Sequence, residues 1–187
     1  MTDIKLYEYA PTRSLKCRWI LNEAGLEYES RGNAPEIIHS QELCEVQPLG
    51  KLPAAIIDGR NLFESSAIVA AIADRVPEKH LIARPGTFER SRYDQWSFFA
   101  TSEIESWAWC ALLNTHEFLQ SKEEHVPEII PQMKKHFQLG AQAVEDHLAD
   151  HSFMVEDRFS ATDINVGYAV HLGQFAGFLE DRFVNLQ

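Results

Sequence analysis

The chain of 187 residues is long enough for one domain, or two small ones, with a substantial buried core. Hydrophobic residues make up 45% and charged residues 24%, which is typical of a soluble globular protein. The net charge of -11, from 17 Lys and Arg against 28 Asp and Glu, opposes nucleic acid or an anionic membrane as a general partner.

Nothing in the sequence indicates export or membrane insertion. No apolar run approaches the roughly 20 residues that span a bilayer, and the N-terminal "MTDIKLYEYA" lacks the layout of a signal peptide. Cys17, Cys44 and Cys110 are odd in number and far apart, so they form neither a disulfide framework nor a metal cluster. The eight histidines show no metal-ligand spacing. We therefore expect a reduced, cytoplasmic protein without a metal.

Strand-like and helical patterns begin at the N-terminus. "DIKLYEY" (Asp3–Tyr9) alternates apolar and polar residues, which predicts a strand. "SLKCRWILNEAG" then predicts a helix with one apolar face, carrying Leu15, Trp19, Ile20 and Leu21, and a stop at Gly25.

The alternation continues to residue 76. A second strand is predicted at Leu26–Ser30 and an irregular helix from near Pro35. Strands at Ala54–Asp58 and Arg60–Glu64 flank a glycine-containing turn and predict an antiparallel hairpin, followed by a helix over residues 65–76. The order is β-α-β-α-β-β-α, in which the first two strands are parallel and joined by a right-handed crossover.

The remainder of the chain has a different texture. "PEKHLIARPG" is predicted to be a linker, and only helical patterns follow it, near residues 87–116, 126–150 and 160–177. Ser160 followed by Asp163 ahead of an apolar run predicts a capping box, a structural signal to which we assign no chemistry. We therefore predict an α/β domain at residues 1–76, a linker at 77–86 and an all-helical domain at 87–187.

A proline stands directly before the third predicted strand. X-Pro is the one peptide bond at which the cis form costs little, so a cis Leu52-Pro53 bond would turn the Leu52 backbone outward to pair with an extended peptide. The alternative is a proline that only begins the strand. Spacing alone favours this second interpretation.

An acid and two hydroxyls stand where the fourth strand meets the third helix. Ser65 or Ser66 is a candidate N-cap, which the local sequence favours. The alternative is a ligand site, because the free N–H groups of a helix start attract an anion. Ser65 would then hold a carboxylate and Glu64 the neighbouring ammonium, the pair of charges found on an α-amino acid.

Thr12, Arg13 and Ser14 occupy the junction between the first strand and the first helix. A hydroxyl there meets the positive end of the helix dipole, which stabilises a nearby thiolate. The alternative is again an N-cap, with Ser14 or Thr12 as the capping residue. Cys17 lies one turn further on and is predicted to be a small buried residue.

The order of these elements resembles a cytosolic glutathione transferase, of the bacterial and fungal branch in particular. The resemblance covers the whole chain, and its most specific segments are "PLGKLPAAIIDG", "LFESSAIVAAIADR" and "DRFSATDIN". It implies a thioredoxin-like domain that binds glutathione and an all-helical domain that supplies a pocket for a hydrophobic electrophile. Because family members continue with further helices after a segment like "RFVNLQ", it also implies a helical domain that is short at its C-terminus.

The resemblance also implies roles for individual residues. The Leu52 backbone before a cis Pro53 would pair with the cysteinyl part of glutathione, and Lys51 would meet the glycyl carboxylate. Glu64 and Ser65 would hold the γ-glutamyl end, with Arg13 and Gln47 at the rim. Thr12, and after it Ser14, is the preferred hydroxyl for activating the thiol, although Tyr7 and Tyr9 lie on the preceding strand.

The implied activity is transfer of alkyl or aryl groups to glutathione by a detoxifying homodimer. Two alternatives stay open. One is glutathione-dependent peroxide reduction or thiol exchange, of which thiol exchange prefers a cysteine that the first loop lacks. The other is a non-catalytic glutathione-binding or interaction module with the same fold, which the unusual Thr12 favours.

Overall fold

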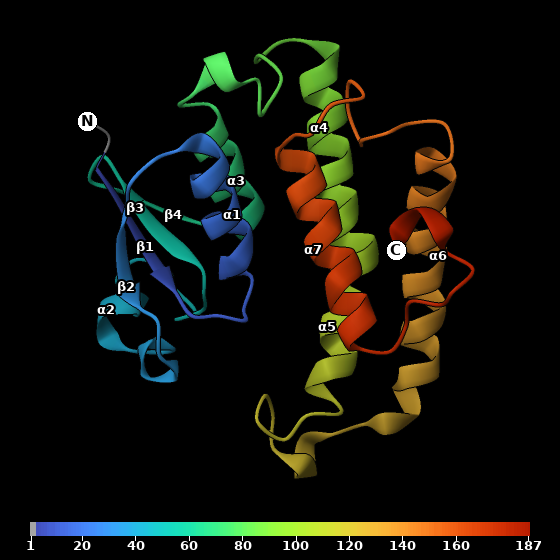
Figure 1. The fold of residues 1–187 in the computed structure, drawn as a ribbon. Coiled ribbons are helices and arrows are strands. Elements are labelled where there is room, and N and C mark those ends of the chain that lie inside the picture. Colours follow the sequence, from blue (N-terminus) through green and yellow to red (C-terminus); the bar gives the residue numbers. More distant parts are fainter. Residues whose placement is uncertain (1–2) are drawn as a thin grey trace. The chain divides into compact units, whose positions relative to one another are not determined.

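A computed structural model describes residues 3–187 of the chain, which divide into two compact units, one ending at Arg84 and one beginning at Pro85 (Figure 1). The first unit is a small sheet with helices on it, and the second is helical. The predicted fold class, a thioredoxin-like domain followed by an all-helical one, is confirmed. None of the helices in residues 3–187 is both long and apolar enough to cross a membrane.

The sheet of the first unit has four strands in the order β2-β1-β3-β4. β1 pairs in parallel with β2 and antiparallel with β3, and β3 forms a hairpin with β4. Alternation along β1 sends Leu6 to one face of the sheet and Tyr7 to the other. The strands are β1 (Ile4–Glu8), β2 (Glu29–Gly32), β3 (Ala54–Ile57) and β4 (Arg60–Phe63).

The second strand begins later than the sequence predicts, because the turn that ends the preceding helix includes the residue after Gly25. Gly25 is left-handed with φ 65°, and its N–H donates to the carbonyls of Asn22 and Leu21. The Leu26 N–H also donates to the Leu21 carbonyl, at 3.1 Å, which closes a Schellman motif. Leu26 therefore belongs to the helix-ending turn, and the expected strand over residues 26–30 is observed at β2, Glu29–Gly32.

Helices cover both faces of the sheet. α1 (Ser14–Ala24) and α3 (Ser65–Ala73) pack side by side on one face (Figure 1). On the other face, Leu43 and Val46 pack with Tyr7 and Ala54, which joins the α2 region to β1 and β3. The irregular helix predicted there is a 3₁₀ turn, η1 (Pro35–Ile37), followed by a single turn of α-helix, α2 (Gln41–Cys44).

One prediction about α1 is wrong. Trp19 does not face the core: its side chain is 42% exposed, and its Nε1 donates to Glu23 at 3.1 Å. The face turned to the sheet instead carries Cys17, which is fully buried as predicted. Burial raises the pKa of the Cys17 thiol to about 12, so this thiol is protonated and inert at neutral pH.

The helical unit is built on one long, interrupted helix. The pattern near residues 87–116 is observed as α4 (Phe88–Phe99), a π-helical segment η3 (Ala100–Glu105) and α5 (Ser106–Leu113). α6 (Ile130–Leu148) and α7 (Ala161–Phe175) pack against it. Short 3₁₀ turns in this unit are η4 (Lys122–Glu124), η5 (Pro127–Ile129) and η6 (Val184–Leu186), and η2 (Pro77–Lys79) lies near the end of the first unit.

Glycine permits the closest approach between these helices. A Cβ at Gly140 on α6 would lie 2.4 Å from the backbone oxygen of Glu103 in η3. Around this contact the core contains buried side chains from all the helices, including Ile104, Phe137 and Val144. Because backbone oxygen cannot move aside as a flexible side chain can, position 140 admits only glycine at this spacing.

The predicted capping box is present at the start of α7. The Ser160 Oγ accepts from the Thr162 N–H at 3.3 Å, and the Asp163 carboxylate accepts from the Ser160 N–H at 2.8 Å. The second Asp163 oxygen accepts from the Met154 N–H at 2.9 Å, so the box also anchors the loop before the helix. These contacts satisfy N–H groups that a helix start would otherwise leave unpaired.

Replacing Ser160 by alanine is expected to lower the free energy of unfolding by about 1 kcal/mol, because the first turn of α7 loses its cap. Urea titration followed by circular dichroism measures the change. Ser91→Ala, at an exposed position of α4, is the matched control and should change stability little. Equal effects of the two variants would contradict the capping role.

A stacked pair of histidines closes the C-terminal end of α6. The His147 Nε2 lies 3.0 Å from the Met154 carbonyl oxygen, and the His147 and His151 rings stack with centroids 4.4 Å apart. Burial, with smaller contributions from His151 and Arg92, lowers the pKa of His147. The hydrogen bond to the Met154 carbonyl opposes this shift, but burial outweighs it, so the folded state favours the uncharged ring.

Stability is expected to fall as the solution is acidified through the histidine range. The unfolded chain binds a proton at His147 near its ordinary pKa of 6.5, whereas the folded chain does so only at lower pH. The contribution of His147 is therefore complete above that value and is lost as pH falls through the folded pKa. Urea unfolding at stepped pH values measures it, and His147→Gln should flatten the slope in this range. An unchanged slope in that variant would contradict the assignment.

Candidate functional site

The register of the sheet brings three junctions together. Tyr7 near the end of β1 pairs with Ala54 at the start of β3, and Ala54 pairs with Phe63 at the end of β4. The loop after β1, the loop before β3 and the start of α3 therefore lie at the same end of the sheet's strands. The residues predicted from the sequence to act in binding and catalysis all lie at or next to this end of the strands.

The assigned residues differ in how far they reach solvent. Lys51 and Glu64 are exposed, whereas Thr12, Arg13 and Leu52 are half-buried. Ser14, Pro53 and Ser65 are buried.

The loop before β3 presents an unpaired backbone beside a cis peptide bond. The Leu52-Pro53 bond is cis, the conformation that would turn the Leu52 backbone outward. Within residues 3–187, no other part of the chain hydrogen-bonds to the Leu52 N–H or carbonyl. Free backbone groups next to a cis-proline can pair with an extended peptide through main-chain hydrogen bonds.

Hydrogen bonds to Gln47 fix the backbone of this loop. Its side-chain Oε1 accepts from the Leu49 N–H at 2.6 Å and from the Lys51 N–H at 3.1 Å. The Gln47 carbonyl also accepts from the Gly50 N–H at 2.9 Å. Gln47 is 6% exposed, so the residue expected at the rim instead shapes the backbone that leads to Leu52.

The start of α3 is not capped by a serine. Ser65 is the first helical residue, and Glu64 occupies the N-cap position without a side-chain capping hydrogen bond, which makes the predicted serine cap wrong. Glu64 has φ 72° and ψ 112°, a left-handed backbone that residues other than glycine rarely adopt. Unusual backbone of this kind collects at ligand sites, because surrounding contacts must hold it in place.

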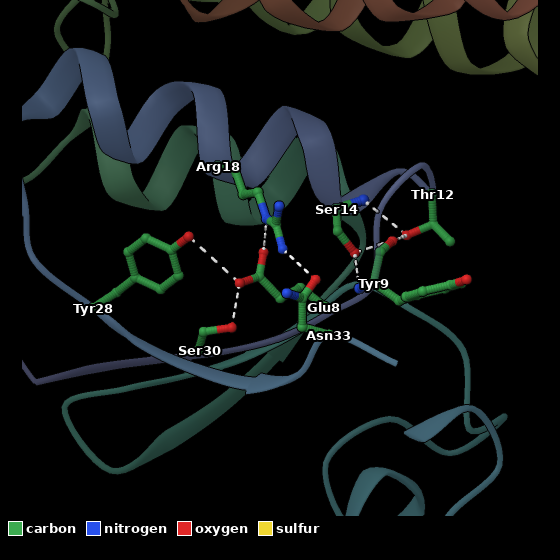
Figure 2. Close-up of polar contacts among 8 residues, drawn as sticks. All are labelled: Glu8, Tyr9, Thr12, Ser14, Arg18, Tyr28, Ser30 and Asn33. Atoms are coloured by element: carbon green, nitrogen blue, oxygen red, sulfur yellow. Dashed lines mark hydrogen bonds and ion pairs between the residues drawn. The ribbon is translucent and has the colours of Figure 1, made fainter. Parts of the chain in front are cut away.

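Two hydroxyls contact each other in the loop after β1 (Figure 2). The Thr12 hydroxyl donates to the Tyr9 carbonyl, and the Thr12 Oγ1 and Ser14 Oγ lie 2.8 Å apart. Since a hydroxyl has only one proton to donate, Ser14 must donate to Thr12. The Ser14 Oγ also accepts from the Tyr9 N–H at 3.3 Å.

This arrangement separates the two candidates for thiol activation. Ser14 is fully buried, and both its donor and its acceptor capacity face the loop. Thr12 is half-buried, and its hydroxyl becomes available when it rotates away from the Tyr9 carbonyl. The N-cap of α1 is Arg13, which makes no side-chain capping bond, so the prediction that Thr12 or Ser14 is the N-cap is wrong.

The tyrosine of the first strand is committed elsewhere. Tyr7 is buried, and its hydroxyl donates to the Glu42 carboxylate at 3.0 Å. Burial and the neighbouring Glu42 raise the pKa of Tyr7. Its proton is therefore held by the α2 region and is not directed at the β1–α1 loop.

A buried carboxylate that was not predicted from the sequence lies next to this loop. Glu8, the last residue of β1, is 1% exposed and ion-pairs with Arg18 of α1 (Figure 2). The available signal was an acid at the position where the alternation Ile4, Leu6 calls for a third apolar residue. Among residues 3–187 no three His, Cys, Asp or Glu side chains converge as a metal ion would require.

The first unit has a thioredoxin-like sheet, with a cis-proline loop and a helix start at one end of its strands, and a helical unit follows it. This arrangement is the glutathione transferase class of fold. Residues 2–74 match the family model described as "Glutathione S-transferase, N-terminal domain". Residues 2–74 therefore form a domain of the glutathione S-transferase family, and the similarity to a transferase of known structure extends over 98% of the chain.

Relatives and solved structures agree with this assignment. Glutathione S-transferase GstA of Escherichia coli is 28% identical over 130 residues, which cover 68% of the chain and 62%, less than two thirds, of that protein. The bacterial transferase BphK, solved as a ternary complex, is 28% identical with a TM-score of 0.84 over 98% of the chain and 89% of its own. The transferase URE2P8 of Phanerochaete chrysosporium, solved with oxidized glutathione, is 21% identical with a TM-score of 0.84 over all of the chain and 86% of its own.

Proposed function

We propose that this protein binds glutathione at the end of the sheet where Tyr7, Ala54 and Phe63 lie. It ionises the glutathione thiol for attack on a hydrophobic electrophile. The observation that carries the proposal is the strand register, which brings the three junctions to that end of the sheet. The solved complex of URE2P8 with oxidized glutathione, a protein of the same fold, supports glutathione as the ligand.

The glutathione backbone pairs with Leu52. Its cysteinyl residue donates to and accepts from the Leu52 carbonyl and N–H, which have no partner within residues 3–187. This places the thiol beside the loop after β1. Lys51, exposed on the same loop, meets the glycyl carboxylate, and half-buried Arg13 contributes positive charge at the rim.

The γ-glutamyl end lies at the start of α3. The exposed Glu64 carboxylate holds the ammonium, and Ser65 with the first N–H groups of the helix holds the carboxylate. The left-handed backbone of Glu64 directs its side chain and the helix N–H groups to one ligand.

Thr12 activates the thiol by donating a hydrogen bond to the sulfur. The bond favours the thiolate over the thiol, as does the positive end of the α1 dipole, so the proton leaves to water at neutral pH. The thiolate then forms a C–S bond with the electrophilic carbon while the leaving group departs with its electron pair. Ser14 keeps the Thr12 oxygen in place from its buried position.

The proposal extends to the whole molecule. Residues 1–76 form the glutathione-binding domain, residues 77–86 the linker and residues 87–187 the helical domain that provides the electrophile pocket. The functional unit is a homodimer that detoxifies electrophiles in the cytoplasm.

A second candidate function is a glutathione-binding module without catalysis. The observation that favours it is the Thr12 hydroxyl, whose proton is already donated to the Tyr9 carbonyl. If Thr12 keeps that bond when glutathione is present, the thiol gains no donor from it.

One experiment separates the candidates. The protein is passed over immobilised glutathione, eluted with free glutathione and assayed for conjugation of a chloronitrobenzene. Retention with turnover supports the transferase, and retention without turnover supports the binding module. A protein that neither binds the resin nor turns over the substrate would overturn both.

A further inference from the structure

A buried acid, Glu8, immediately precedes the loop that contains Thr12. Glu8 ends β1 on the same face as Ile4 and Leu6, which is the face that α1 covers. Its side chain is 1% exposed, and a carboxylate at such a position requires partners that compensate for lost hydration.

Those partners come from α1 and from the stretch of chain around β2 (Figure 2). Arg18 of α1 donates its Nε–H to the Glu8 Oε2. The Glu8 Oε1 accepts from the Ser30 hydroxyl at 2.5 Å and from the Tyr28 hydroxyl at 3.4 Å. Arg18 also donates through a second nitrogen to the Asn33 Oδ1 at 2.7 Å, and the Glu8 carbonyl accepts from the Asn33 N–H at 2.8 Å.

The Glu8–Arg18 pair spans the loop of residues 9–13. Glu8 immediately precedes Tyr9, whose N–H donates to the Ser14 Oγ and whose carbonyl accepts from the Thr12 hydroxyl. Arg18 lies four residues after Ser14, so both project from one side of α1. The ion pair therefore fixes the end of β1 relative to the start of α1, and the two hydroxyls lie on the backbone between these fixed points.

We propose that Glu8 and Arg18 are positioning residues that hold the β1–α1 loop so that the Thr12 hydroxyl meets the glutathione sulfur. The inference rests on the proposed function, since it assigns the pair a task in thiol activation. A pair that served only stability would be an uncertain gain, because the desolvation of the buried Glu8 carboxylate offsets much of its attraction to Arg18, whose side chain is 28% exposed. Its position across the functional loop supplies a role that stability alone does not.

The test compares Glu8→Gln with wild type and with Asp58→Asn as the matched control. Glu8→Gln keeps the shape of the side chain and removes its charge. Asp58→Asn breaks an ion pair of 3.0 Å with Arg75 in the same unit, at the opposite end of the strands. Asn33→Gly is a milder second variant, which removes the amide that holds Arg18 and suits the backbone φ of 57°.

Three readouts are taken on the folded protein: steady-state kinetics, ultraviolet titration of the bound glutathione thiol, and amide hydrogen exchange of residues 9–14. Glu8→Gln is expected to lower kcat about 10- to 100-fold with a much smaller change in KM for glutathione, because a displaced loop misplaces the donor. The titration should move towards that of free glutathione, and exchange in residues 9–14 should quicken. Asn33→Gly should shift all three readouts in the same direction by less, and Asp58→Asn should shift none.

Each failure has a distinct signature. If wild type itself does not lower the thiol titration of bound glutathione, the proposed function fails. If wild type does lower it and Glu8→Gln, or Asn33→Gly should the first variant not fold, matches wild type in kcat and titration, the positioning inference fails. An effect of Asp58→Asn equal to that of Glu8→Gln would also overturn it.

Discussion

Replacing Thr12 by alanine is expected to lower kcat/KM for conjugation about 10- to 100-fold, since the thiolate loses a hydrogen bond to a charged group. Affinity for glutathione should change far less, because backbone and charge contacts at Leu52 and Glu64 remain. Steady-state kinetics with glutathione varied at fixed electrophile separate the two quantities.

Thr12→Ser is the control for this change, because it keeps the hydroxyl and removes only the methyl group. It should retain most of the activity of the wild type. Activity in Thr12→Ala equal to that in Thr12→Ser would show that another group activates the thiol, and Thr12 would lose its assignment.

Replacing Glu64 by glycine is expected to move stability and affinity in opposite directions. Glycine adopts a φ of 72° without strain, so the free energy of unfolding should rise by about 1 kcal/mol, the strain released less the entropy that glycine adds to the unfolded chain. Affinity for glutathione should fall about 10- to 100-fold, because the ammonium loses its carboxylate partner. Urea unfolding and isothermal titration calorimetry measure the two effects.

Glu64→Gln distinguishes the charge from the backbone. It keeps the strained conformation and nearly the same volume, so stability should match wild type while affinity falls as in Glu64→Gly. A glycine variant that loses stability, or a glutamine variant with full affinity, would contradict the account of this junction.

Features that depend on short-range geometry could be predicted from the sequence. The turn between β3 and β4 involves neighbours along the chain. The capping box of Ser160 and Asp163 likewise depends on a spacing of three residues. In each case the residue types and their spacing define the local conformation, and tertiary packing need only accept it.

Features that depend on packing between segments could not. Trp19 was expected in the core because helical periodicity gives a face but not which neighbour covers it. The burial of Ser14 depends on the loop that folds over it, and the N-cap position of Glu64 depends on a backbone conformation that propensity does not predict for an acid. Glu8 finds its partners up to 25 residues away, at Asn33, where no local pattern reports them.

The titration of the glutathione thiol in complex with the wild-type protein tests the central claim most directly. Ultraviolet absorption of the thiolate is followed against pH at saturating protein and compared with free glutathione. The account predicts a pKa for the bound thiol clearly below that of a free thiol, near 8.5, and a return towards that value in Thr12→Ala. A bound thiol that titrates as it does in free glutathione would contradict thiolate activation by this loop.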